Sequence, residues 1–491
     1  MIRSATVRTS LGFVAAALIC LGFADFEISG SEPWAQLGQL GLGIVTPDFT
    51  AVDQLGVALL RTVAFALVGV ALGAAGGFLL ALAFHWWPVR VGCAFVRAIH
   101  ELFWALIFLQ CFGLHPLTGV LAIAIPYAGV FGKVYAEILD EQDPLPEQSL
   151  PPGTGRIARV LFARIPDAWP HLLSYTSYRL ECGLRSSAIL GFVGMPTLGF
   201  HLESAFNEGY YSQVGALLLT FYILIAPLRL WMRPRLVPLY LVIAPFFLGT
   251  GLPIVWGNVG RFFTSDIVPA PLRAGGGGWE ALWPWLEPIL VQQALPGIGV
   301  TIVLTQIALV LTGVLTLLAF PLVSRHFTGR IGGTLGHVLL VVARSTPEYL
   351  LAYILLQLWG PSMLPAVVAL ALHNGGIIGH LIGRRSNEIR LRRDAPSRLE
   401  RYGYEILPRV YGPFLAFLFY RWEIIMRETA ILGILGITTL GFYVDSAMEA
   451  IRFDVAMLLI GVTAALNIGV DALARYLRRR LRLRTSPVYE S

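Results

Sequence analysis

Residues 178–205 read YRLECGLRSSAILGFVGMPTLGFHLESA, and residues 420–447 read YRWEIIMRETAILGILGITTLGFYVDSA. Fifteen of these 28 positions are identical at a constant offset of 242 residues. This long match inside one chain indicates two copies of a single unit. We place the first copy in residues 1–235, with a core of about 55–235, and the second in 236–491, with a core of about 290–480.

A second match lies upstream, at an offset of 247 residues. It pairs Arg97 with Arg344 and Glu101 with Glu348. Charged side chains inside apolar stretches are expensive to keep in a bilayer. Their repetition points to a transport pathway between two related halves.

The composition excludes an ordinary soluble protein. Of 491 residues, 56% are hydrophobic and 13% are charged, and the mean hydropathy is +0.70. About 20 apolar residues cross the hydrocarbon core as a helix. We therefore expect an all-α integral membrane protein with about 12 transmembrane helices in two homologous six-helix halves. The expected spans are centred near residues 18, 70, 102, 127, 180, 221, 245, 308, 346, 374, 424 and 464.

The arginines predict the orientation. Lys133 is the only lysine among 36 basic residues. Arginines gather after the sixth and tenth expected spans and in the tail 475–484. The positive-inside rule then places both termini in the cytoplasm. The net charge of +6 thus reports topology and favours phospholipid head groups as partners, without indicating nucleic-acid binding.

The sequence contains no recognisable nucleotide-binding, catalytic or metal-binding motif. No phosphate-binding loop of the form G-x-x-x-x-G-K-[ST] occurs, and no nucleophile–base pair is visible, so we expect no enzymatic activity and no cofactor bound by this chain. The cysteines and histidines show no metal-ligand spacing, and we expect neither zinc nor disulfides. The four cysteines are Cys20, Cys93, Cys111 and Cys182.

Each half has one sizeable cytoplasmic loop before its fifth expected span. In the first half it covers residues 140–166, and its beginning is rich in proline and glycine. Residues 156–164 then show a short amphipathic helical pattern. Such a surface helix is suited to docking on a cytoplasmic partner.

This loop resembles the coupling loop of bacterial ABC importer permeases, E-A-A, three residues, G, nine residues, I-x-L-P. Glu147 and Gly153 occupy that frame, which ends at Ile165 and Pro166. The second copy ends the same frame at Leu407 and Pro408, but Ala395 stands where glycine is expected. We assign these residues to ATPase coupling.

The neighbouring motifs narrow the resemblance to phosphonate-type permeases. They are R-x-x-x-E in the third span and Y-R-x-E-x-x-x-R-x-x-x-x-L-G-x-x-G in the fifth, and the resemblance covers most of the chain. It implies a type I ABC importer fold in the bacterial inner membrane that takes up a phosphonate, phosphite, phosphate or related oxyanion. It also implies a periplasmic binding protein and cytoplasmic ATPases that bind ATP and Mg. Because the chain has two coupling loops, we expect two ATPase subunits for one chain.

Ten charged residues within the expected spans are candidates for the substrate pathway. Arg–Glu spacings of four residues would place each pair on one helix face. Two readings stay open: a salt-bridge cluster that holds the bundle together, or arginine forks that face the path and bind an oxyanion. The two are compatible. The candidates are Arg97, Glu101, Arg179, Glu181, Arg185, Arg344, Glu348, Arg421, Glu423 and Arg427.

The glycines at the outer end of the fifth span also leave two readings. Gly191, Gly194 and Gly199 repeat as Gly433, Gly436 and Gly441. They indicate either close helix packing or a helix break that lines the external mouth.

A secondary transporter with twelve spans is the alternative function, in which Glu101, Glu181, Glu348 and Glu423 would carry protons. The coupling loops favour the importer, because a secondary transporter needs no docking helix.

Overall fold

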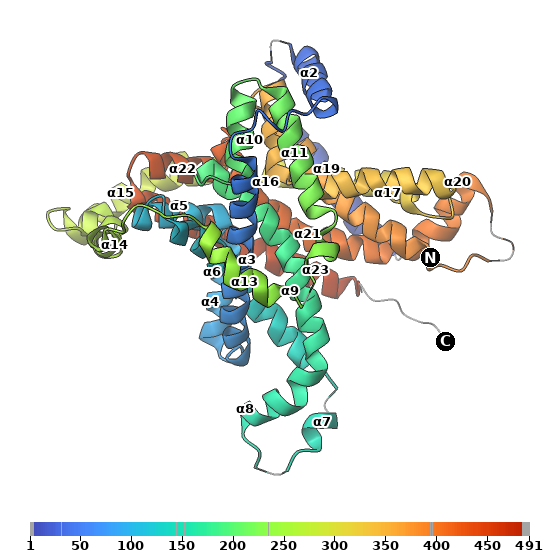
Figure 1. Cartoon of the computed structure of the whole chain (residues 1–491), viewed down its shortest axis with the longest axis horizontal. Coiled ribbons are helices and arrows are strands. Elements are labelled where there is room, and N and C mark those ends of the chain that lie inside the picture. Colours follow the sequence, from blue (N-terminus) through green and yellow to red (C-terminus); the bar gives the residue numbers. More distant parts are fainter. Residues whose placement is uncertain are drawn as a thin grey trace. The chain divides into compact units, whose positions relative to one another are not determined.

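The computed structural model describes residues 4–30, 32–143, 145–151, 153–233, 235–392, 394 and 396–483. All regular elements in these ranges are helical (Figure 1). The chain forms two compact units. One is residues 39–265, and the other joins the residues up to 38 with those from 266 onward.

The unit of residues 39–265 is built around the packing of α3 (Leu55–Leu82) on α6 (Pro116–Asp140). Gly69, Gly73 and Gly77 recur every four residues along one face of α3 and lie against side chains of α6. Small residues at this spacing let two membrane helices approach closely. The unit also contains α4 (Trp87–Ala98), α5 (Glu101–Phe112), α9 (Ile165–Ile189), α10 (Leu198–Asn207) and α11 (Tyr211–Ile225).

The second unit repeats this plan, with α16 (Leu295–Val323) packed on α19 (Met363–Ser386). Here the glycines lie on the other partner. Gly375, Gly379 and Gly383 of α19 face side chains and backbone of α16. The remaining repeated helices are α17 (Arg330–Ser345), α18 (Glu348–Trp359), α21 (Leu407–Ile434), α22 (Leu440–Glu449) and α23 (Phe453–Arg480).

The prediction of an all-α membrane protein is confirmed. In the described part of the chain, five helices are long and apolar enough to cross a membrane, and seven if each of two bent helix pairs is one span. Helices lie at eleven of the twelve expected centres, and the twelfth, residue 346, falls at the break between two helices. However, α9 and α21 carry many polar and charged residues, and the helices at three positions are short: α1 (Ser4–Leu21), α11 and α13 (Val237–Phe247).

The spans expected near residues 102 and 346 are not straight helices. Helices α4 and α5 meet at 91°, and α17 and α18 meet at 87°. Ile99 and His100 are extended between the first two helices, and Thr346 and Pro347 are extended between the second two. Pro347 cannot continue the preceding helix, because it lacks the amide hydrogen.

The helix that leads each copy packs on the first core helix of the other copy. Helix α1 lies on α16, and α13 lies on α3. Packing therefore groups the chain differently from the repeat boundary that we place at residue 235: the N-terminal helix joins the second bundle, and residues 236–265 join the first. Shorter helices outside the repeated set include α2 (Pro33–Val45), α12 (Leu228–Trp231), α14 (Trp256–Arg261) and α15 (Leu282–Ile289).

Candidate functional site

The first copy has a polar cluster beside the bend between α4 and α5. Glu101 is the first residue of α5, where the helix dipole favours a carboxylate. Ser186 of α9 donates a hydrogen bond to Glu101 Oε1 at 2.8 Å. The Tyr127 hydroxyl of α6 lies 3.4 Å from Ser186 Oγ. His100 caps α5, because its Nδ1 accepts from the Leu102 amide at 3.1 Å. Three helices thus meet at one buried carboxylate.

The second copy forms a related cluster with different residues. Glu348 begins α18, and His373 Nε2 lies 3.4 Å from its Oε2. His373 Nδ1 lies 2.7 Å from the Thr346 carbonyl oxygen. The neighbouring Asn374 donates to Glu428 Oε2 at 3.2 Å. Asn374 is fully buried, and Glu428 is 7% exposed. Here two carboxylates are held inside the bundle.

The two clusters occupy equivalent positions of the repeat. The offset of 247 residues pairs Tyr127 with Asn374, and the offset of 242 pairs Ser186 with Glu428. Sequence reasoning missed these four residues because it followed identities between the copies. A search for positions that are polar in both copies, even where the residue types differ, would have identified them.

Among the predicted pathway residues, Glu181 and Arg185 lie one turn apart on α9. Arg185 Nη2 is 3.9 Å from Glu181 Oε1, and the two side chains are 14% and 28% exposed. Arg179 has a different environment. Its Nε donates to the Tyr175 hydroxyl at 2.8 Å, and its guanidinium lies 5.4 Å from the Tyr175 ring and 5.9 Å from the Tyr127 ring, within the range of cation–π attraction.

The equivalent residues of the second copy lie along α21. The uninterrupted helix places Glu423 and Arg427 one turn apart, and Arg421 lies two residues before Glu423. All three side chains are partly buried. The repeat thus keeps these charges at the same helical positions in α9 and α21.

In both copies the third span bends between the arginine and the glutamate, so the two residues do not share the face of one continuous helix. Arg97 and Glu101 lie on opposite sides of the 91° bend, and Arg344 and Glu348 on opposite sides of the 87° bend. A spacing of four residues brings side chains together only within a continuous helix. The bends therefore remove the physical basis for a shared face, although all four residues remain close to the bends.

The glycine motif marks a true helix break. The chain leaves α9 through a short 3-10 turn to Gly194, whose φ is 85°. In the second copy Gly436 has a φ of 93°. Such values favour glycine. A side chain at Gly191 would collide with the backbone of Gly199 and Phe200. The helix therefore breaks, and the chain packs closely where it turns back; that the break lines the external mouth stays a prediction.

The short helices after the two breaks carry half-buried acids at equivalent positions. Burial raises the pKa of Glu203 in α10. Burial and the nearby Glu449 raise the pKa of Asp445 in α22 to about 6. In both cases the cause is that burial disfavours the charged form of a carboxyl group.

The two predicted coupling loops enter the long helix that follows them in the same way, through a short helix and a π-helical turn. In the first, α7 (Leu145–Gln148) is followed by α8 (Arg156–Arg159) and a π-helical turn over Val160–Arg164. Ile165 and Pro166 then begin α9. In the second, α20 (Arg398–Glu400) and a π-helical turn over Arg401–Ile406 lead to Leu407 and Pro408, which begin α21. Proline is well suited to the first turn of a helix.

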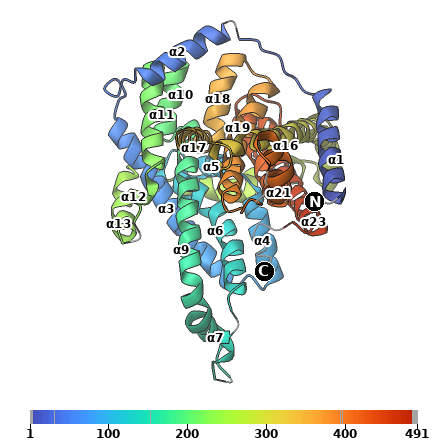
Figure 2. The ribbon, with the colours of Figure 1, turned by 90° about the vertical axis from the view of Figure 1, so that its right-hand side faces the viewer.

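The other three residues predicted to take part in coupling precede these helices in the chain. Gly153 has a φ of 91° and turns the chain between α7 and α8. Glu147 lies in α7, but its side chain and the whole of Ala395 lie outside the described residues. Figures 1 and 2 show α7 at the end of α9, away from the rest of its bundle.

Each predicted coupling loop has an exposed aromatic residue three positions before the first residue of the following helix, Ile165 or Leu407. Phe162 is 74% exposed and Tyr404 is 81% exposed. The two are equivalent at the offset of 242 residues. Sequence reasoning missed them, because the amphipathic pattern drew attention to the residues before Phe162.

The second loop is also tied to its own bundle. The Tyr402 ring stacks on Phe320 at 5.4 Å, and its hydroxyl donates to the Leu317 carbonyl at 3.1 Å. The buried Glu405 accepts from Arg409 at 2.7 Å. These contacts on both sides of Tyr404 fix the backbone that presents its side chain to a docking partner.

No group of three or more histidine, cysteine, aspartate or glutamate side chains in the described ranges could hold a metal ion. The four cysteines are free.

Two copies of one helical bundle, each with a charged helix that follows a predicted coupling loop, are consistent with the permease subunit of an ABC importer. Comparisons with known proteins give the particular family. The chain is 25% identical over 430 residues to the phosphate-import permease protein PhnE of Mycolicibacterium smegmatis, a match that covers 80% of this chain and 77% of the relative.

Two further relatives match single regions. The phosphite transport system permease protein PtxC of Stutzerimonas stutzeri is 30% identical over 187 residues, 35% of this chain and 66% of the relative. The putative cryptic phosphonate transport system permease protein PhnE2 of Escherichia coli is 30% identical over 100 residues, 20% of this chain and 82% of the relative. The chain belongs to this family of phosphonate-type permeases. No family model and no solved structure matches it.

Proposed function

We propose that this chain forms the membrane path of an importer for phosphate, phosphite, a phosphonate or a related oxyanion in the bacterial inner membrane. Both termini face the cytoplasm. A periplasmic binding protein delivers the anion, and two cytoplasmic ATPase subunits, which hold ATP and Mg, drive its passage. The substrate class rests on the phosphate, phosphite and phosphonate permeases that the chain resembles. The chain itself has no enzymatic role in this scheme.

The repeated charges on α9 and α21 carry this proposal. Glu181 and Arg185 form a close pair on α9, and Glu423 and Arg427 keep the same spacing on α21. A guanidinium can bind two oxygens of a phosphoryl group at once. The neighbouring glutamate weakens that attraction, so the anion binds loosely and passes on. Proton carriage by these glutamates, the alternative, is not favoured because the relatives are components of transport systems.

The coupling loops support the partner assignment. Phe162 and Tyr404 are large aromatic residues that are mostly exposed, and isolated aromatic anchors of this kind often dominate a protein interface. Their equivalent positions suit two identical ATPase subunits, one for each loop.

Neutralising a charged pair tests the pathway. A single Arg185→Ala change would leave Glu181 unpaired and damage folding and transport together. Glu181→Gln with Arg185→Gln removes both charges and retains similar volumes. We expect normal assembly with the ATPase but phosphate uptake reduced roughly tenfold, the value of one lost charge-assisted hydrogen bond.

Two further variants complete the experiment. Glu423→Gln with Arg427→Gln should behave like the first pair. Lys133→Gln with Glu137→Gln is the matched control, since this pair of α6 also lies at four-residue spacing, with the charged atoms 3.8 Å apart, and its glutamate is 56% exposed. Normal uptake of labelled phosphate by both test variants would remove these arginines from the mechanism.

A further inference from the structure

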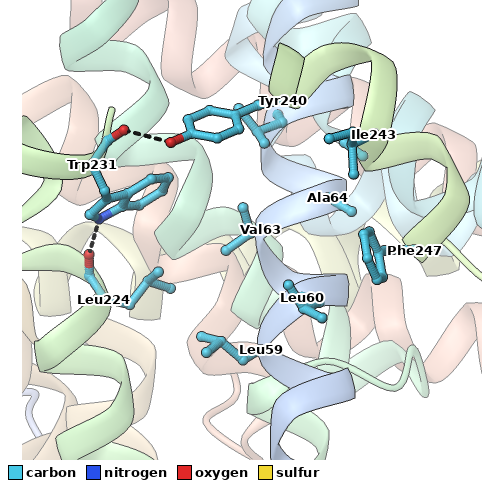
Figure 3. A pocket seen from close by; sticks show the side chains of 11 residues that line it. Leu59, Leu60, Val63, Ala64, Leu224, Trp231, Tyr240, Ile243 and Phe247 are labelled. Carbon is cyan, nitrogen blue, oxygen red and sulfur yellow. Dashed lines mark hydrogen bonds between the residues drawn. The ribbon is translucent and has the colours of Figure 1, made fainter. Parts of the chain in front are cut away.

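An apolar pocket of about 290 Å³ lies between α3 and α13 (Figure 3). Leu60, Val63 and Ala64 line it from one face of α3, and Ile243, Ala244 and Phe247 line it from one face of α13. These residues are spaced by three and four along each helix, so two apolar helix faces oppose each other without filling the space between them.

The polar atoms near the pocket are already bonded to backbone. Trp231 Nε1 donates to the Leu224 carbonyl at 3.0 Å, and the Tyr240 hydroxyl donates to the Trp231 carbonyl at 2.9 Å. Figure 3 shows both bonds at one end of the pocket. The rings of Trp231 and Tyr240 therefore offer apolar surface, and the pocket suits a hydrocarbon ligand.

The related contact in the other unit is closed by protein. Helix α1 packs on α16, where Gln306 Nε2 donates to the Phe13 carbonyl at 3.0 Å. The Phe13 ring lies 5.2 Å from the ring of Phe419 and 5.0 Å from that of Trp422. Among the side chains that the structure describes, none fills the gap between α13 and α3 in a comparable way. An unfilled gap forfeits dispersion contacts along its walls, and in a bilayer an acyl chain is at hand to restore them.

The turn between α12 and α13 carries positive charge next to this pocket. Arg233 and Arg235 are exposed, and the Arg233 amide donates to the same Trp231 carbonyl that accepts from Tyr240. Residues 225–247 include no aspartate or glutamate. The charge is thus not neutralised within its own segment, and basic residues beside a membrane attract anionic lipids.

We propose that the pocket between α3 and α13 binds an acyl chain of an anionic phospholipid whose head group lies against Arg233 and Arg235. The lipid completes the packing of α13, a helix too short to cross the membrane alone. This site is independent of the substrate path and would persist even if the transported anion were of another class.

Photocrosslinking in vesicles tests the proposal. The full chain, with a benzophenone side chain in place of Ile243, is reconstituted in equal amounts of phosphatidylglycerol and phosphatidylcholine. We expect phosphatidylglycerol to be labelled in excess by at least about fivefold, the factor that one arginine beside an anionic lipid supplies. The same side chain at Val242, which is 67% exposed and does not line the pocket, should label both lipids equally.

Two sets of variants separate the head group from the acyl chain. Arg233→Gln with Arg235→Gln should abolish the preference at Ile243, whereas Arg8→Gln with Arg90→Gln, which changes two exposed arginines elsewhere, should leave it. Ala244→Leu should lower total lipid labelling at Ile243 by filling the pocket. Equal labelling of the two lipids at Ile243 in the otherwise unchanged chain, or crosslinks to protein alone, would overturn the proposal whatever the variants do.

Discussion

At the scale of single residues, the two copies keep a buried polar cluster but not its chemistry. In the first copy Tyr127 and Ser186 surround one carboxylate, whereas in the second Asn374 and Glu428 occupy the matching positions. Removing the donor to a buried carboxyl group costs more than removing a long contact between two hydroxyls. The bond from Asn374 to Glu428 should therefore contribute more to stability than the contact between Tyr127 and Ser186.

Removing one donor from each cluster tests this difference. Asn374→Leu leaves the buried Glu428 without its 3.2 Å hydrogen bond, and we expect it to cost about 2 kcal/mol or more. Tyr127→Phe removes only a 3.4 Å contact between hydroxyls and should cost about 0.5 kcal/mol. Thermal unfolding of the purified chain measures both. Equal losses would show that the two clusters contribute alike.

At the scale of elements, each predicted coupling loop passes through a π-helical turn into a long charged helix. The turn exposes one aromatic side chain and buries its neighbour: Phe162 is exposed beside the buried Ala163, and Tyr404 beside the buried Glu405. An exposed aromatic residue of this kind is available to a partner and adds little to the packing of its own bundle.

Truncating these aromatics should separate binding from stability. We expect Phe162→Ala and Tyr404→Ala each to weaken ATPase binding roughly tenfold, as for a moderate interface anchor, with no change in thermal stability. Tyr402→Ala is the contrasting variant, because Tyr402 stacks on Phe320 and its loss should lower stability. Binding of the purified ATPase in detergent gives the affinities. Unchanged affinity in both exposed-residue variants would exclude these side chains from the interface.

At the scale of the whole molecule, one chain contains two bundles and two coupling loops. Each leading helix packs on the core of the other copy, α1 on α16 and α13 on α3. Such exchanged contacts tie the copies together beyond the covalent link, and they are satisfied within a single chain.

We therefore expect one chain to assemble with two ATPase subunits. The native mass of the purified complex measures this ratio directly. A complex with two copies of this chain for each ATPase pair would contradict the prediction, and so would a stable complex with a single ATPase subunit under conditions of excess ATPase.

The sequence by itself determined the duplication, the membrane class, the buried charges on the fifth helix of each copy and the family. All of these are local or repeated signals. Hydropathy is a property of a segment about one helix long, and a repeat is found by comparing residues at a constant offset. The prolines at the start of α9 and α21, Pro166 and Pro408, belong to the same group, because helix-start preferences act over a single turn.

Only the tertiary structure decided where the spans bend and what meets at the bends. Hydropathy averages over about 20 residues, so it does not register a turn made by Ile99 and His100. The meeting of Tyr127 with Ser186, or of Asn374 with Glu428, depends on the packing of helices far apart in sequence. The pocket beside α13 likewise depends on how two separate apolar faces fit, and shape complementarity is not encoded in the pattern of either face alone.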